Sequence, residues 1–485
     1  MVSGSGAIIG AFVAFWAYTA WALWWISGHG PMLPVGLPLS GLALAAGWRM
    51  RRPVSFARFI SRPLRGRWRR VTVYGRCWDA AMTACRVASG PRTAAEDFPR
   101  LLGVSCTSCG DVVRVAMLLG QTLAQWVASA DRLAQAFNAP ACRVAPVPGR
   151  PQQLRLIFTT RDALAEPVPP FTPLDAGALD LEAVPVAARE DGTAYCMPVL
   201  YAHTLIAGET GAGKGSVLWS VLAGIAPAIR SGLVQVWAID PKGGMELGTG
   251  AALFARFAYG TPVEAADAPD AKVEKGAKAA PAWQEDMAAL LELAVQVMQA
   301  RAAKLRGVSR KHTPTVAEPL VLVVIDELAA LTAYVTDAAI KKRLSAALGL
   351  LLSQGRAVGV SVIGATQDAR KETLNMRDLF SRRVALRTAE ADMGDLILGS
   401  GHRARGFRTD QISAATPGVA YVAADSGNDP ARVRFTYLDD AHIRALAAGY
   451  RPTHPGALVP VPDTPTSAAP HDASQDGGPD SPEAA

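Results

Sequence analysis

The stretch HTLIAGETGAGKGSVLWS, from His203 to Ser220, decides the fold of the larger part of this chain. An apolar run leads into a glycine-rich loop that ends in a lysine, and a helix-like run follows. This order is typical of a phosphate-binding loop, in which backbone N–H groups surround phosphate oxygens. The pattern G-x-x-x-x-G-K-[ST] requires Ser or Thr after the lysine, whereas this chain has Gly215 there. The sequence therefore raises the question of whether the nucleotide site works.

Nine residues form the predicted loop and are expected to hold the nucleotide. The glycines let the backbone turn its N–H groups toward phosphate oxygens, and Lys214 would reach the β- and γ-phosphates. Gly215 has no hydroxyl for Mg²⁺, so we expect Ser216 or a water molecule to complete the metal shell. Ser216 lies about 100° further round a helix. The predicted nucleotide-binding residues are Gly208, Glu209, Thr210, Gly211, Ala212, Gly213, Lys214, Gly215 and Ser216.

A second apolar run, LVLVVIDELAAL from Leu320 to Leu331, contains the adjacent acids Asp326 and Glu327. An acidic pair directly after a buried strand is the second element that a nucleotide-hydrolysing site needs. We expect Asp326 to hold Mg²⁺ through water and Glu327 to polarise the attacking water. Together with the loop, the pair predicts an ATP hydrolase with ATP and Mg²⁺ as cofactors.

Two further apolar runs end in polar residues. AIDPKGG places Asp240 and Lys242 after one run, and GATQD places Thr366 and Gln367 after another. In a parallel sheet the carboxyl ends of the strands line the ligand crevice, so these side chains should lie near the loop. Gln367 is then placed to sense the γ-phosphate.

Short continuous apolar runs alternate with helical stretches across residues 171–450. Buried parallel strands have this appearance, so the sequence predicts an α/β fold with a mainly parallel sheet and helices on both faces. We expect a smaller α/β module over 71–170 and a surface insertion at 262–282. Residues 451–485 are expected to be disordered, because Pro, Ala, Ser and Asp dominate them without periodicity. The expected strands of the larger domain are 204–208, 234–240, 320–326, 360–366 and 383–388.

Residues 1–48 contain no Asp, Glu, Lys or Arg. The run from Ala7 to Ile26 is long enough to cross a bilayer as a helix, and Met32 to Trp48 is a candidate second span. A signal peptide would need a positively charged start, which this N-terminus lacks. Nine arginines and no acid follow over residues 49–70, and such positive flanks stay in the cytoplasm. We therefore expect a cell-membrane anchor with the ATPase on the cytoplasmic side.

The net charge of +7 is weak evidence for nucleic acid. Once the nine arginines and the five acids of the tail are set aside, residues 71–462 carry only +3. The excess of basic residues mostly indicates which side of the membrane the chain lies on, and attraction to anionic lipid is a second effect. The six cysteines fall on the predicted cytoplasmic side and are expected to be reduced thiols, although Cys106 and Cys109 have zinc-knuckle spacing.

Five motifs carry a family resemblance when they are taken in order. They resemble the motor domain of the FtsK/SpoIIIE-type DNA translocases, and most closely the plasmid-transfer, TraB-like branch of actinomycetes. The resemblance covers about residues 180 to 445. It implies a RecA-like P-loop core in a hexameric ring, with double-stranded DNA in the central channel. The motifs are HTLIAGETGAGKGS, AIDPKGGMEL, VVIDELAAL, GRAVGVSVIGATQD and DLFSRRVALR.

The resemblance also implies hydrolysis sites between subunits, each completed by an arginine from the neighbour. The family's TRIAF segment matches RRVAL here, so Arg383 is the expected finger. Arg382 stands where the family often has Thr, which leaves the assignment open by one residue. Relatives that recognise DNA sequence carry a C-terminal winged helix, for which the roughly thirty residues after Pro452 leave no room. A separate DNA-loading partner is therefore expected.

These observations predict a membrane-anchored, ATP-driven pump for double-stranded DNA in conjugative plasmid transfer. Three alternatives stay open at this point. They are a chromosome-segregation translocase, a secretion ATPase of related fold that moves protein, and a scaffold in which Gly215 marks a degenerate loop. Stimulation of hydrolysis by nucleic acid separates the DNA pumps from the other two classes.

Overall fold

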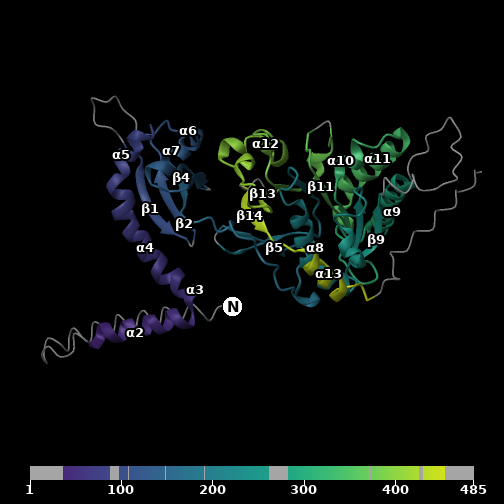
Figure 1. The fold of residues 1–485 in the computed structure, drawn as a ribbon, viewed down its shortest axis with the longest axis horizontal. Coiled ribbons are helices and arrows are strands. Elements are labelled where there is room, and N and C mark those ends of the chain that lie inside the picture. Colours follow the sequence, from purple (N-terminus) through teal and green to yellow (C-terminus); the bar gives the residue numbers. More distant parts are fainter. Residues whose placement is uncertain are drawn as a thin grey trace, which may run out of the picture. The chain divides into compact units, whose positions relative to one another are not determined.

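A computed structural model shows how the chain divides into two compact units, residues 1–163 with 404–406, and residues 164–403 with 407–485. Figure 1 shows the ribbon with its elements labelled. The structure describes residues 36–87, 98–107, 109–147, 149–190, 192–260, 282–370, 373–424 and 430–453.

The N-terminal unit contains a long helical segment and a four-stranded antiparallel sheet in the order β1-β2-β4-β3. Alternate residues of β4 are buried, and Leu154, Leu156 and Phe158 pack with Trp126 in one core. Two short helices, α6 and α7, lie between β2 and β3. The elements are α2 (Gly36–Arg51), α3 (Pro53–Phe56), η1 (Ala57–Ser61), α4 (Arg62–Arg69), η2 (Arg70–Gly75), α5 (Arg76–Ala84), β1 (Arg100–Cys106), β2 (Gly110–Ala116), α6 (Leu123–Ala128), α7 (Ala130–Ala136), β3 (Ala141–Val147) and β4 (Arg150–Thr159).

The predicted membrane spans meet the described residues only in part. Among the helices that the structure describes, none combines the length and the hydrophobicity that a span requires. Helix α2 takes up part of the predicted second span, has 16 residues and carries Arg49 and Arg51 in its last turn. The predicted first span, Ala7 to Ile26, lies outside the described residues, as do almost all of 262–282 and 451–485.

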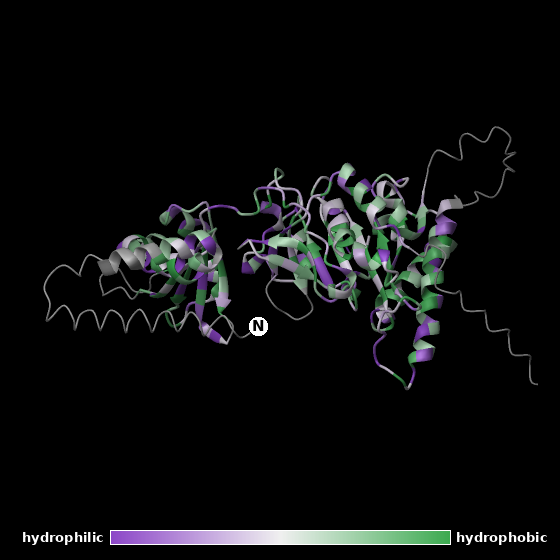
Figure 2. Ribbon diagram, turned by 90° about the horizontal axis from the view of Figure 1, so that it is seen from below, coloured by the Kyte–Doolittle hydropathy of each residue, from purple (hydrophilic) through white to green (hydrophobic). Residues whose placement is uncertain are grey.

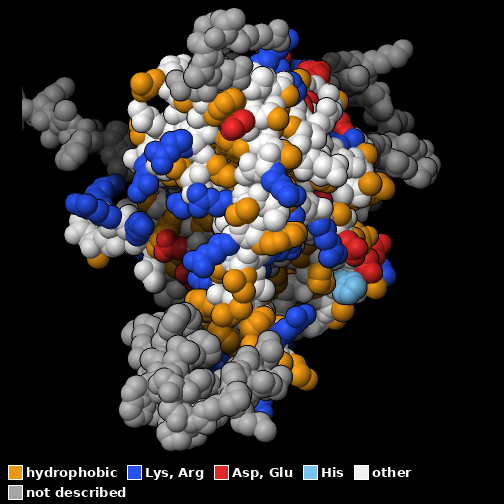
Figure 3. All heavy atoms as spheres, turned by 90° about the vertical axis from the view of Figure 1, so that its left-hand side faces the viewer, with side chains coloured by type: hydrophobic (Ala, Val, Ile, Leu, Met, Phe, Trp, Pro, Cys, Tyr) orange, Lys and Arg blue, Asp and Glu red, His pale blue; other side chains and the backbone are white. Residues whose placement is uncertain are grey.

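The arginines that follow the predicted spans lie on the helical segment from α2 to η2. Most of them are exposed, as a solvated or lipid-facing surface requires. On the face drawn in Figure 3, Lys and Arg side chains clearly outnumber those of Asp and Glu. All six cysteines of the chain are free thiols, in agreement with the expectation from the sequence.

The larger unit is built on a ten-stranded sheet in the order β6-β5-β14-β13-β12-β7-β11-β10-β8-β9. The six strands from β12 to β9 are parallel, which confirms the α/β prediction, and four antiparallel strands extend the sheet beyond β12. The antiparallel extension was not predicted. The strands are β5 (Val184–Arg189), β6 (Ala194–Met197), β7 (Thr204–Ala207), β8 (Val234–Asp240), β9 (Phe254–Tyr259), β10 (Leu320–Ile325), β11 (Val360–Thr366), β12 (Arg382–Ala385), β13 (Val419–Ala424) and β14 (Ala431–Phe435).

Hydrophobic cores lie on both faces of the parallel strands. Every residue of β10 is buried, and alternate residues face two different clusters, one containing α8 and the other α9 and α11. Figure 2 shows how strongly hydrophobic the strands of this unit are. The helices are α8 (Lys214–Arg230), α9 (Ala282–Leu305), α10 (Leu328–Thr332), α11 (Ala338–Gln354), α12 (Met393–Leu398) and α13 (Asp440–Gly449), with short 3-10 turns at η3 (Ala176–Ala178), η4 (Gly248–Leu253), η5 (Arg356–Val358), η6 (Arg377–Leu379), η7 (Arg403–Arg405) and η8 (Thr409–Gln411).

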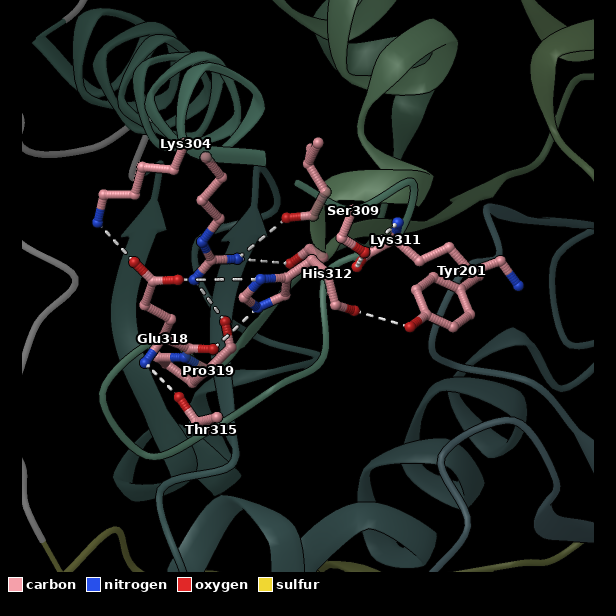
Figure 4. Close-up of polar contacts among 11 residues, drawn as sticks. Tyr201, Lys304, Ser309, Lys311, His312, Thr315, Glu318 and Pro319 are labelled. Carbon is pink, nitrogen blue, oxygen red and sulfur yellow. Dashed lines mark hydrogen bonds and ion pairs between the residues drawn. The ribbon is translucent and has the colours of Figure 1, made fainter. Parts of the chain in front are cut away.

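A buried arginine of α9 forms hydrogen bonds with the backbone just before β10 and β11. Arg301 is 3% exposed, and its guanidinium donates to the carbonyls of Pro319 at 2.6 Å and Gly359 at 2.9 Å. His312 lies in the same cluster and contacts the carbonyl of Glu318 at 2.9 Å, as Figure 4 shows. Because these contacts lie at the amino ends of the strands, the carboxyl ends are left for the functional site.

Candidate active site

The predicted phosphate-binding loop connects the carboxyl end of β7 to the start of α8. Gly211 and Gly213 have φ of +76° and +96°, a region that side chains with a β-carbon rarely adopt. A β-carbon on Gly213 would also overlap the backbone nitrogen of Gly418, and the N–H of Gly418 donates to the carbonyl of Ala212 at 2.9 Å. The loop is thus held between β7 and the turn that precedes β13.

Lys214 turns back onto its own loop. Its ammonium donates to the carbonyls of Gly208 at 2.9 Å and Glu209 at 3.1 Å. The side chain of Glu209 forms an ion pair with Arg387, which follows β12. Burial lowers the pKa of Lys214, and the nearby carboxylate of Glu327 opposes this shift. A phosphate group would give the ammonium a charged partner in place of two carbonyls.

The predicted acidic pair lies at the carboxyl end of β10. Asp326 and Glu327 are 3% and 5% exposed. The ammonium of Lys242 lies 2.7 Å from Asp326 Oδ2 and 3.5 Å from Glu327 Oε2. Burial raises the pKa of Asp326, and Lys242 opposes that effect. A cation next to two buried carboxylates is what this site requires, and here Lys242 supplies it.

Gln367 connects the loop to the acidic pair. Its backbone N–H donates to Glu327 Oε1 at 3.2 Å, and its side-chain oxygen accepts from the hydroxyl of Thr210 at 3.0 Å. Gln367 directly follows β11, which lies between β7 and β10 in the sheet. The structure therefore brings the loop, the acidic pair and the predicted sensor together at one edge of the sheet.

Asp240, which the sequence placed near the ligand, organises a loop. It is fully buried, and its carboxylate accepts three backbone N–H bonds at 3.0 Å, from Lys242, Glu246 and Leu247. These bonds shape the turn after β8, and the turn carries Lys242 toward Asp326. Thr366 is likewise buried, and its hydroxyl donates to the carbonyl of Asp368 at 2.8 Å.

Position 215 has an unexpected neighbour. A β-carbon built on Gly215 would overlap Oε1 of Glu246 and lie 3.0 Å from its Cδ. Ser216 lies beside Gly418 instead, where a β-carbon on that glycine would be 3.6 Å from Cβ of Ser216 and 3.8 Å from its Oγ. The role of Ser216 as a metal ligand stays a prediction. A carboxylate, however, occupies the place of the side chain that Gly215 lacks.

Arg383 lies on β12, where it pairs with Leu205 of β7. Its guanidinium is 3.4 Å from Asp378, and its side chain is 19% exposed. Since the loop leaves β7 after Ala207, Arg383 stands toward the amino end of the strands relative to its own loop. Within the described residues, no hydrogen bond or ion pair joins Arg383 to the residues of the loop.

The donor set suits a nucleotide with Mg²⁺. Mg²⁺ in such sites keeps several waters and takes only one or two protein carboxylates beside the phosphates. No group of three or more His, Cys, Asp or Glu residues that could hold a metal by themselves occurs among the described residues. The exposed Glu246 and the buried Asp326 provide hard oxygen donors, and the N–H groups at the start of α8 provide the phosphate cradle.

Two contributors to this site were not assigned by the sequence analysis. They are Glu246, which lies within the segment AIDPKGGMEL, and Arg387. No spacing rule connects Glu246 to Gly215, which is 31 positions earlier in the chain. The one available signal was the missing hydroxyl at position 215, which implies that another group fills its place.

Comparisons with known proteins agree with this geometry. Residues 180–405 match the model of the FtsK/SpoIIIE family. The chain is 28% identical over 411 residues to the transfer protein TraSA of Streptomyces ambofaciens, covering 79% of this chain and 91% of that protein.

Solved structures with a similar course of the chain include a coupling protein and a secretion ATPase. The pCW3 conjugation coupling protein TcpA, with ATPγS, has 18% identity and a TM-score of 0.44, covering 73% of this chain and 93% of that one. The cytoplasmic domain of the type VII secretion ATPase EccC of Thermomonospora curvata has 18% identity and a TM-score of 0.42, covering 59% and 33%. The segment that matches the FtsK/SpoIIIE family model, residues 180–405, contains the phosphate-binding loop, the acidic pair and Gln367.

Proposed function

We propose that this protein is a membrane-anchored, ATP-dependent translocase of double-stranded DNA that serves conjugative plasmid transfer. The observation that carries the proposal is the joining of Lys214, Asp326, Glu327 and Gln367 at the carboxyl edge of one parallel sheet. The similarity to a transfer protein over most of both chains supports DNA transfer as the process that hydrolysis drives.

Each residue of the site has a part in the proposed reaction. Bound ATP with Mg²⁺ supplies the phosphoryl group that is transferred to water. Lys214 leaves the carbonyls of Gly208 and Glu209 and binds phosphate oxygens, which stabilises negative charge as it develops. Glu327 orients the attacking water and accepts its proton. The backbone N–H of Gln367 donates a hydrogen bond to Glu327. If Gln367 moves when the nucleotide changes, Glu327, which positions the water, would therefore move with it.

We propose that the working form is a ring, with six copies as the expected number. Arg383 would then act in the site of the neighbouring subunit. Its place toward the amino end of β12 supports action in trans, because its own loop leaves the opposite end of β7. The exposed arginines of α2 to η2 support a position against the anionic inner face of the cell membrane, and a separate partner would select the DNA.

ATP hydrolysis by the full chain, with duplex DNA, single-stranded DNA or none, tests the proposal. We expect duplex DNA to raise the rate and Lys214→Ala to abolish it. Lys304→Ala is the matched control, since Lys304 is exposed and lies at the amino ends of the strands, where its partner is Glu318. A rate that is indifferent to nucleic acid would overturn the DNA pump in favour of a motor that moves protein. Recovery of the chain from washed membranes tests the anchor.

A further inference from the structure

The missing hydroxyl at position 215 has a replacement in this structure. In the usual loop, the Ser or Thr that follows the lysine gives an oxygen to Mg²⁺. Here a β-carbon on residue 215 would overlap Oε1 of Glu246, so a carboxylate oxygen already lies where that side chain would begin. Gly215 and Glu246 are thus complementary, because the glycine provides the space that the carboxylate fills.

The position of Glu246 is fixed by its own backbone. Its N–H donates to the buried carboxylate of Asp240 at 3.0 Å, which anchors the turn after β8. The same turn carries Lys242 to Asp326. Among the described residues, the Glu246 carboxylate forms no hydrogen bond or ion pair, although Asp326, Lys242 and Lys214 are near enough for their charges to act on it. The carboxylate therefore faces the elements of the site that hold phosphate and metal.

A carboxylate in this place has a cost unless a cation accompanies the nucleotide. The start of α8 attracts phosphate through its free N–H groups and dipole. A negative oxygen beside Gly215 repels the same phosphate, whereas it is a good ligand for Mg²⁺, which prefers hard oxygen donors.

We propose that Glu246 replaces the loop hydroxyl as a ligand of the nucleotide-bound Mg²⁺, directly or through one water, and that Gly215 is the glycine that makes room for it. This inference rests on the proposed ATPase function. It makes Gly215 an adapted position rather than a defect. It also assigns the metal shell to Glu246 rather than to Ser216, which lies beside Gly418.

Nucleotide affinity measured with a fluorescent ATP analogue, in Mg²⁺ and in EDTA, tests the assignment without any hydrolysis. In Mg²⁺ we expect Glu246→Gln to bind the analogue about tenfold or more weakly than the full wild-type chain, the loss typical of a perturbed metal site. In EDTA we expect the order to reverse, because the neutral amide no longer repels phosphate. Glu318→Gln is the matched control, since Glu318 lies at the opposite ends of the strands.

A second variant restores the usual chemistry by another route. Glu246→Ala removes the carboxylate, and Gly215→Ser added to it supplies a hydroxyl with room for its β-carbon. We expect the double variant to regain the Mg²⁺-dependent affinity that Glu246→Ala loses. Electron paramagnetic resonance of Mn²⁺ with the nucleotide should show the same loss and recovery.

Several outcomes would overturn the inference. Tighter binding by Glu246→Gln in both buffers would make Glu246 a repelling group only. Equal affinity of Glu246→Gln and the wild-type chain, in Mg²⁺ and in EDTA alike, would mean that Glu246 only fills space. Loss of Mg²⁺ dependence in Ser216→Ala with none in Glu246→Gln would give the metal to Ser216. If the wild-type chain bound no nucleotide in either buffer, the proposed function itself would fail, and the inference with it.

Discussion

Replacing the buried Arg301 with methionine should destabilise the larger unit more than any change to its exposed ion pairs. Methionine keeps an unbranched apolar stem but gives no donor to the carbonyls of Pro319 and Gly359. Hydrogen bonds to charged groups contribute about 1.5 to 3 kcal/mol each, so two short ones represent about 3 to 6 kcal/mol. Because burial lowers the pKa of Arg301 to about 10, the guanidinium is itself held at a desolvation cost. Methionine removes that cost, which offsets part of the lost hydrogen bonding. We therefore expect the free energy of unfolding to fall by about 3 kcal/mol.

The matched control is Arg343→Met. Arg343 contacts Glu285 at 2.5 Å and Glu292 at 2.7 Å, so by its contacts it looks at least as important as Arg301. Glu285 is exposed and Glu292 is half-exposed, and ion pairs open to solvent stabilise little. Urea unfolding followed by hydrogen–deuterium exchange in peptides of β10 reports on this unit alone. If Arg301→Met shifted the midpoint no more than Arg343→Met, the reasoning from burial would be refuted.

Three further predictions concern pH and catalysis. Burial lowers the pKa of His203 to about 3. The free energy of unfolding should therefore be highest above pH 6.5 and fall by roughly 1.4 kcal/mol per pH unit as pH falls toward 3. Across pH 4 to 7, the free energy of unfolding of His203→Gln should depend less on pH than that of the wild type, and an equal dependence would contradict this. Glu327→Gln should keep nucleotide affinity and slow single-turnover hydrolysis by about 10²- to 10⁴-fold; unchanged turnover would remove Glu327 from the role of base. Arg383→Ala should lose about 10³-fold or more in rate, and mixing it with Lys214→Ala should restore activity in part, whereas an absence of complementation would argue against action in trans.

The core of the fold could be predicted because its signals are local. The five expected strands correspond to β7, β8, β10, β11 and β12, two of them with the same bounds and the others within three residues at each end. Parallel strands buried on both faces need uninterrupted apolar runs, and such runs can be read one at a time. The strands β5, β6, β9, β13 and β14 were missed. Most of them mix buried residues with partly exposed ones, so they lack the fully buried apolar runs of the central strands.

The site shows the same division between local and distant information. Lys214 and the Asp326–Glu327 pair follow from short motifs whose chemistry requires those residue types. Glu246 could not be found in this way, because its contact with Gly215 depends on the turn after β8 meeting the start of α8. The membrane spans rest on composition alone, and the first lies outside the described residues.

The backbone contacts that fix the phosphate-binding loop affect how tightly nucleotide can bind. The N–H of Gly418 holds the backbone of the loop at Ala212, and β7 holds its other end. The entropy of ordering this segment is therefore lost once, during folding, and not again at each encounter with ATP. A motor that binds and releases nucleotide in every cycle gains from such preorganisation, since each turnover begins from a receptor that is already shaped.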